Sequence, residues 1–121
     1  MTEPLLQTAF HAWHREHGGR LVDFAGWDMP VQYTSITEEH TAVRTSVGLF
    51  DIAHMGRLVF SGPDACRLLD RLVTNDVAVL EVGSVRYALV CRDDGGILDD
   101  VLVYRFEADY LLVVNGSNRL K

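Results

Sequence analysis

The stretch DDGGILDD, residues 93–100, decides the fold of the second half of this chain. Asp-Gly and Gly-Gly pairs between two runs rich in apolar and β-branched residues are a strong short-range signal for an antiparallel hairpin. The two runs are residues 85–92 and 97–106. We therefore predict a hairpin, followed after a short turn by a further strand over 110–114.

Side chains alternate between the two faces of a strand, so the second run divides cleanly. One face carries Leu98, Asp100, Leu102, Tyr104 and Phe106. A two-residue turn at Gly95-Gly96 would place Tyr87 opposite Tyr104. A turn at Asp94-Gly95 shifts the pairing but keeps the same faces. Both registers predict that Tyr87, Asp100 and Tyr104 share a surface that is otherwise apolar.

A carboxylate within an apolar strand face costs free energy unless a hydrogen bond, a cation or a ligand compensates it. Two interpretations of Asp100 are equally favoured. Its carboxylate binds or deprotonates a nitrogen of a flat aromatic ligand, or it is a solvated acid of an ordinary hairpin. For Asp93, Asp94 and Asp99 the solvated interpretation is favoured. Asp99 points to the other face, where we expect it to meet Arg92. The run does not match a calcium-binding loop.

The remaining segments predict helices and strands in turn. Apolar spacing predicts a helix over 4–17, and the next residues, 20–34, favour strand and loop. Further along we expect a helix from Ser35 to about 46 with a capping box at Ser35 and Glu38, a strand over 55–61, and a helix from about 61 to 75. The fold class is therefore α+β, with helices packed on a largely antiparallel sheet. Ser117 and Asn118 have the form of caps for another helix, so we expect the fold to continue past Lys121.

The composition argues against several classes of function. The 121 residues are 48% hydrophobic, which is enough for a core in one domain or a piece of one. A net charge of −6 argues against a nucleic-acid surface. No apolar run is long enough for a membrane span, and the N-terminus lacks a basic signal region, so we expect a cytoplasmic protein. The two cysteines, Cys66 and Cys91, fit ordinary core thiols in a reducing compartment.

Three histidines, His11, His14 and His17, recur every third residue in the first predicted helix. They lie off its apolar stripe, so we expect solvated side chains and no metal site. His54 is expected to be structural. No glycine-rich phosphate loop or nucleophile motif is present in the sequence.

Several phrases taken together are similar to one family. They are LVDFAGWDMPVQY (21–33), EEHTAVRTSVGLFDIAHMGRL (38–58), LVTNDV (72–77), DDGGILDDVLVYR (93–105) and VVN (113–115). Over nearly its whole length, the chain resembles the N-terminal part of the aminomethyltransferase family, the T-protein of the glycine cleavage system.

The resemblance implies one leaf of a cloverleaf, folate-binding fold. It implies transfer of an aminomethyl group from the lipoyl arm of the H-protein to tetrahydrofolate, with release of ammonia and formation of methylene-tetrahydrofolate. The family's key acid falls on Asp100. Its folate contacts fall on Met55, Tyr87, Leu102 and Tyr104.

Members of the family are considerably longer than this chain. We therefore expect residues 1–121 to be the N-terminal, incomplete part of the folate-binding domain and to be inactive alone. Three alternatives stay open at this point. They are a folate-binding domain of a sarcosine- or dimethylglycine-oxidising enzyme, a non-catalytic folate-binding protein of the kind that assists iron–sulfur cluster assembly, and an inactive fragment.

Overall fold

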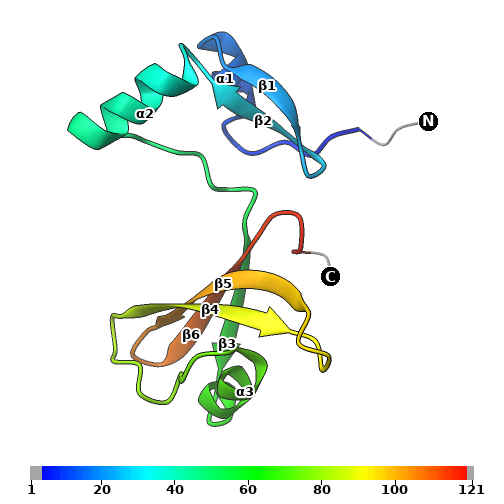
Figure 1. The fold of residues 1–121 in the computed structure, drawn as a ribbon, viewed down its shortest axis with the longest axis vertical. Coiled ribbons are helices and arrows are strands. Elements are labelled where there is room, and N and C mark those ends of the chain that lie inside the picture. The colour runs from blue at the N-terminus through cyan, green and yellow to red at the C-terminus, as the bar shows by residue number, and fades with distance from the viewer. Residues whose placement is uncertain (1–3, 120–121) are drawn as a thin grey trace. The chain divides into compact units, whose positions relative to one another are not determined.

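The computed structural model describes residues 4–119, and the chain divides into two compact units, Met1–His54 and Met55–Lys121 (Figure 1). Helices and antiparallel strands occur in both units, so the α+β class is confirmed. Within residues 4–119, no helix has the length and apolar character that crossing a membrane requires.

The first unit is built on a short hairpin. Strands β1 (Arg20–Phe24) and β2 (Trp27–Gln32) pair antiparallel, and helices α1 (His11–Glu16) and α2 (Ile36–Thr45) flank them in the chain. The hairpin turn consists of Ala25 and Gly26, both with positive φ, at 52° and 83°. Two consecutive left-handed residues suit the twist of a tight hairpin, and Gly26 adopts this conformation without steric cost, whereas the Cβ of Ala25 makes it less favourable there.

The predicted helix over 4–17 is wrong in its first half. Only His11–Glu16 is helical. The backbone of Leu6 instead accepts a hydrogen bond from Asp28 N–H and donates one to the Gly26 carbonyl, both at 2.8 Å. Leu6 therefore forms a parallel bridge beside Trp27, and that use of its backbone is incompatible with a helix.

The predicted helix after Ser35 is confirmed, and so is its cap. Ser35 is extended, and its hydroxyl oxygen accepts the N–H of Glu38. The carboxylate of Glu39, one residue further, accepts the backbone N–H groups of Tyr33 and Thr34. These hydrogen bonds join the start of α2 to the end of β2 and hold the pKa of Glu39 below its ordinary value.

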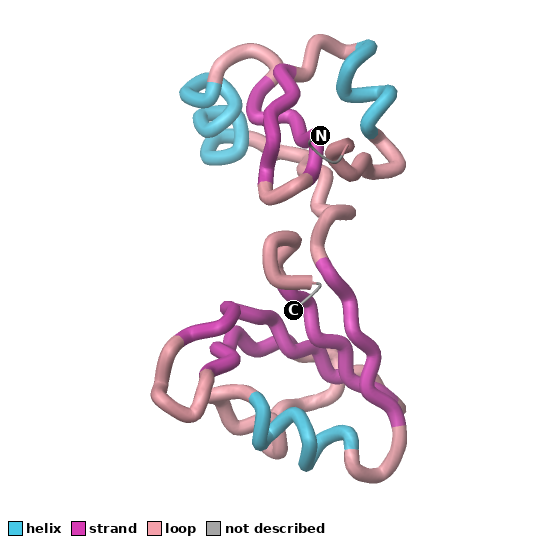
Figure 2. Tube along the Cα trace, turned by 90° about the vertical axis from the view of Figure 1, so that its right-hand side faces the viewer, coloured by secondary structure: helices cyan, strands magenta, loops and turns pink. Residues whose placement is uncertain are grey.

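The second unit is a four-stranded antiparallel sheet with one helix. Its elements are β3 (Gly56–Ser61), α3 (Ala65–Leu72), β4 (Val85–Cys91), β5 (Ile97–Arg105) and β6 (Asp109–Val114), and the strands lie in the order β3-β6-β5-β4. Figure 2 shows α3 against one face of this sheet. The strands and helix predicted for this half of the chain are confirmed.

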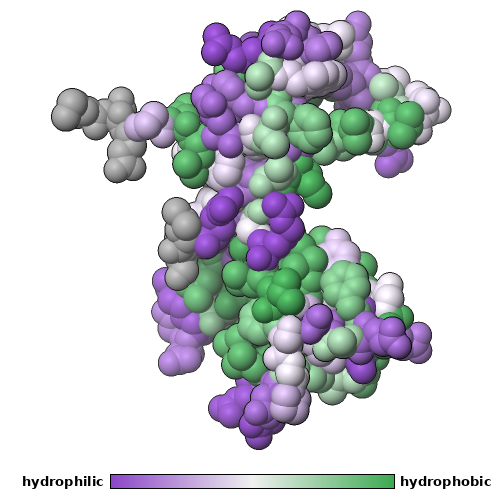
Figure 3. All heavy atoms as spheres, turned by 180° about the vertical axis from the view of Figure 1, so that it is seen from behind, coloured by the Kyte–Doolittle hydropathy of each residue, from purple (hydrophilic) through white to green (hydrophobic). Residues whose placement is uncertain are grey.

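The core of the second unit lies between the sheet and α3. Its best-buried side chains are those of Leu69, Val77, Val101 and Val103, each at most 2% exposed. Each such side chain contributes about 1.5–3 kcal/mol by leaving water. Because α3 covers only this face, the opposite face of the sheet stays open. Figure 3 shows hydrophobic residues gathered over much of the side of the unit that it presents.

The hairpin turn differs from both predicted turns. Asp93, Asp94 and Gly95 form a three-residue loop, in which Gly95 has a φ of 84° and donates its N–H to the Arg92 carbonyl at 2.9 Å. An irregularity follows: Cys91 opposes Ile97, but Val90 opposes Asp99, so the register skips Leu98. This bulge shifts the pairing of the two strands by one residue. The resulting register is the one predicted for a turn at Asp94-Gly95.

Candidate functional site

The open face of the second unit collects four of the five predicted site residues. Tyr87 on β4 lies directly opposite Leu102 on β5, and Leu89 lies opposite Asp100. Tyr104 follows Leu102 on the same face. Tyr87 is 55% exposed, whereas Val101 and Val103, which alternate with the site residues, are at most 2% exposed. The predicted sharing of a face by Tyr87, Asp100 and Tyr104 is therefore confirmed, while the Tyr87–Tyr104 pairing is wrong.

Met55, the fifth predicted residue, lies outside the hairpin, immediately before β3. It is half-buried. The next residue, Gly56, pairs with Val114 on β6, and Asn115 after Val114 contacts Asp100. The structure therefore places Met55 at the same end of the sheet as Asp100, although β3 and β5 are separated by β6.

Asp100 is exposed on the open face. Its Oδ1 atom accepts a hydrogen bond from the side-chain amide of Asn115 at 2.8 Å, and its backbone carbonyl accepts from the same amide at 2.9 Å. Among residues 4–119, no hydrogen bond reaches the second carboxylate oxygen. That oxygen can accept a proton or a hydrogen bond from a bound molecule.

The expected role of Asp99 is wrong. Asp99 is 8% exposed rather than solvated, and Arg92 contacts Asp94 instead, with Nε 3.2 Å from Oδ1. The reason is the segment after β6, which brings amide donors to the end of β5. Asp99 accepts from the backbone N–H and side-chain amide of Asn115, at 3.0 and 2.8 Å, and from the amide of Asn118, at 2.7 Å.

These donors determine the ionisation of Asp99. Burial alone would raise the pKa of its carboxyl group, but the hydrogen bonds from Asn115 and Asn118 outweigh burial and lower it. Asp99 is therefore a buried carboxylate that stays charged at neutral pH. Asn115 is the residue that sequence reasoning missed, although VVN (113–115) was among the phrases that carried the family resemblance.

His11 and His14 differ from the expectation of solvated side chains, whereas His17 is exposed as expected. His11 and His14 are 7% and 4% exposed, while the apolar Phe10 is 59% exposed. His11 Nε2 lies 2.7 Å from Asp28 Oδ2, and His17 stacks on the ring of Trp13. Because α1 is short and carboxylates lie on the elements beside it, its histidine side is buried. No group of three or more potential metal-binding side chains occurs in the part of the chain that the structure describes.

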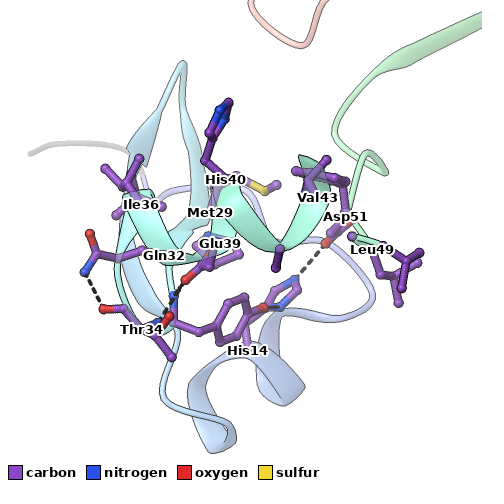
Figure 4. A pocket seen from close by; sticks show the side chains of 17 residues that line it. His14, Met29, Gln32, Thr34, Ile36, Glu39, His40, Val43, Leu49 and Asp51 are labelled. Atoms are coloured by element: carbon purple, nitrogen blue, oxygen red, sulfur yellow. Dashed lines mark hydrogen bonds and ion pairs between the residues drawn. The ribbon is translucent and has the colours of Figure 1, made fainter. Parts of the chain in front are cut away.

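A hollow of about 540 Å³ lies within the first unit, lined by α2, β2 and residues 47–51. Its wall combines the apolar side chains of Met29, Val43 and Leu49 with a hydrogen-bonded pair, His14 and Asp51 (Figure 4). None of the five predicted site residues lines it. His14 and Asp51 bond to each other, and Gln32 and Glu39 bond to backbone groups of residues 33 and 34.

Comparison with known proteins covers almost all of the chain. The sequence profile described as the GCVT N-terminal domain matches residues 10–121. The aminomethyltransferase of Rubrobacter xylanophilus is 55% identical over 117 residues, which are 97% of this chain and 32% of that protein. The aminomethyltransferase of Halothermothrix orenii is 58% identical over 106 residues, which are 87% of this chain and 30% of that protein.

A solved structure agrees with these sequence matches. The crystal structure of glycine cleavage system aminomethyltransferase T from Bartonella henselae superimposes with a TM-score of 0.90 at 35% identity. The match covers 96% of this chain and 33% of that one. The chain therefore spans about a third of the length of the relatives it matches.

Proposed function

Because the chain belongs to the GCVT N-terminal domain family, we propose that it is the N-terminal part of a glycine-cleavage aminomethyltransferase that uses tetrahydrofolate as the carbon acceptor. The proposed one-carbon donor is the aminomethyl group on the lipoyl arm of the H-protein. The products are ammonia and methylene-tetrahydrofolate. The cytoplasmic location expected from the sequence stays part of this proposal.

One observation carries the proposal: a carboxylate, Asp100, stands on an open sheet face beside two tyrosines and a leucine. Tyr87, Leu102 and Tyr104 offer flat and apolar surfaces, which suit the aromatic pterin of a folate. Asp100 has an oxygen available for a polar hydrogen on such a ligand. Met55, at the same end of the sheet, adds a soft, adaptable contact.

In this proposal the residues of the chain have separate roles. The tyrosines and Leu102 bind and orient the ring system. Asp100 accepts a hydrogen bond from a folate nitrogen and stabilises positive charge as the N5 nitrogen attacks the methylene carbon. The bonds from this carbon to the amino nitrogen and to the lipoyl sulfur break, and the two protons lost from N5 and N10 leave with ammonia and the lipoyl thiol. Holding the folate and the aminomethyl group together would supply the larger share of the rate enhancement, because good orientation of two reactants lowers the activation barrier by about 7–11 kcal/mol.

The decisive experiment measures folate-dependent ammonia release by the full-length polypeptide that carries this sequence. Asp100→Asn is nearly isosteric but removes the negative charge. We expect turnover at saturating tetrahydrofolate to fall by about 10²–10⁴-fold. If Asp100 only positioned folate, binding would weaken while turnover at saturation survived.

Asp99→Asn is not a neutral control for this experiment, because Asp99 is buried and binds two asparagines. Asp93→Asn is the better control, since Asp93 is exposed in the hairpin loop and the substitution removes the same charge. Equal and small losses in Asp100→Asn and Asp93→Asn would remove Asp100 from the reaction and the proposed function with it.

A further inference from the structure

We propose that Asn115, anchored by the buried Asp99, is a positioning residue that holds the Asp100 carboxylate in place on the open face. This inference rests on the proposed function of Asp100. It assigns to Asn115 a part in turnover that is separate from its part in stability.

The contacts converge on one nitrogen. Nδ2 of Asn115 lies 2.8 Å from Oδ1 of Asp99, 2.8 Å from Oδ1 of Asp100 and 2.9 Å from the backbone oxygen of Asp100. An amide nitrogen carries two hydrogens, so the three acceptors share them. A single amide group thus joins two neighbouring carboxylates that originate on opposite faces of β5.

The amide is itself held at a second point. The backbone N–H of Asn115 donates to Oδ2 of Asp99 at 3.0 Å, so one residue contacts both oxygens of the buried carboxylate. Asn118 adds a further donor to Asp99 at 2.7 Å. Because Asp99 is 8% exposed and charged, it cannot give up these donors without leaving a buried charge unsatisfied. The position of the Asn115 amide is therefore set by the fold.

Asp100, in contrast, has little else to restrain it. Its side chain is exposed, and an exposed aspartate samples several rotamers. The hydrogen bond from Asn115 selects the rotamer in which Oδ1 is occupied and the second oxygen stays available. Because rates depend steeply on the geometry of reacting groups, the loss of this restraint should reduce turnover.

Asn118 provides a control, because its side-chain amide donates to the same Oδ1 atom of Asp99 as that of Asn115, whereas the hydrogen bonds to the carbonyl and carboxylate of Asp100 come from Asn115. The experiment uses the full-length polypeptide with Asn115→Ala, Asn118→Ala, Asp100→Asn and the double variant Asn115→Ala/Asp100→Asn. Folate-dependent turnover at saturation is measured together with thermal unfolding. If Asn115→Ala does not fold, Asn115→Ser replaces it, since one hydroxyl hydrogen cannot serve three acceptors.

We expect Asn115→Ala to lower turnover by about 10- to 100-fold, while Asn118→Ala stays within about twofold of the unchanged protein. In the double variant the Asn115 substitution should cost almost nothing further, because the carboxylate that it positions is already gone. Equal losses in the two asparagine variants, or a full additional loss in the double variant, would overturn the inference. Full turnover in Asp100→Asn alone would instead contradict the proposed function.

Discussion

The Nε2 atom of His14 lies 2.8 Å from Oδ2 of Asp51, and each side chain is 5% exposed. Thr8 donates its hydroxyl to the same oxygen at 2.6 Å, and the hydroxyl of Tyr33 lies 2.5 Å from the other ring nitrogen of His14. Since a carboxylate only accepts, the hydrogen of the His14–Asp51 contact is on Nε2. These hydrogen bonds join α1 to Tyr33, directly after β2, and to the segment after α2.

His14→Ala should therefore destabilise the first unit. It removes one of the hydrogen-bond donors of Asp51 and the ring partner of Tyr33. The loss should be about 3 kcal/mol, at the low end for a broken buried pair, because Thr8 and Ala53 still donate to Asp51. Urea unfolding measures the loss. His17→Ala, on the exposed side of α1, should cost about 1 kcal/mol or less. Equal losses in the two variants would mean that the His14–Asp51 contact adds no stability.

Acid should weaken the protein through Asp99. A carboxyl group whose pKa is lower when folded stabilises the fold above its unfolded pKa, and that stability disappears as the pH falls through the folded value. We expect full stability above about pH 5 and progressive loss below it, since an unfolded aspartate titrates near about 3.9.

Asp99→Asn tests this titration. The variant should be about 1–3 kcal/mol less stable at pH 7 and should lose less stability on acidification, because the titrating group is gone. The acid loss should not vanish, since the pKa of Asp51 is also lowered by hydrogen bonds that outweigh its burial. Parallel stability curves for the unchanged protein and Asp99→Asn between pH 7 and 3 would show that Asp99 does not contribute.

The two faces of β5 should respond differently to substitution. Val103 is 1% exposed in the core, so Val103→Ala should cost about 2 kcal/mol of unfolding free energy. Tyr104 lies on the open face, so Tyr104→Leu should cost less than about 1 kcal/mol. In the full-length polypeptide, Tyr104→Leu should weaken tetrahydrofolate binding about tenfold through lost stacking. Calorimetry and thermal unfolding together check both variants, and unaltered folate affinity in Tyr104→Leu would argue against a folate-binding face.

The 121-residue chain alone should bind tetrahydrofolate weakly or undetectably. It spans about a third of the length of its relatives, and its candidate site is a single open face rather than an enclosed cavity. Small ligands bind tightly when most of their surface is buried. Isothermal titration provides the test, and tight, stoichiometric binding would show that this third of the protein suffices.

Much of the candidate site followed from strand parity. Alternation along β5 places Asp100 and Tyr104 on one face for either predicted turn. The prediction that they share a face is therefore correct, although the loop itself was predicted incorrectly. The burial and hydrogen bonds of Asp99 could not be predicted from this alternation. Its environment comes from Asn115 and Asn118, which lie 16 and 19 residues away and reach it only because β6 pairs with β5.

The sequence by itself determined local events: the cap of α2 at Ser35, the hairpin around Gly95, and the amphipathic division of β5. Each depends on residues within a few positions of one another, whose preferences act before any packing. The tertiary structure alone decided the burial of His11 and His14 and the absence of helix over the first half of residues 4–17. In both cases a distant segment offered a partner, Asp28 and Asp51 for the histidines and the backbone of residues 26 and 28 for Leu6, and these hydrogen bonds outweighed the local pattern.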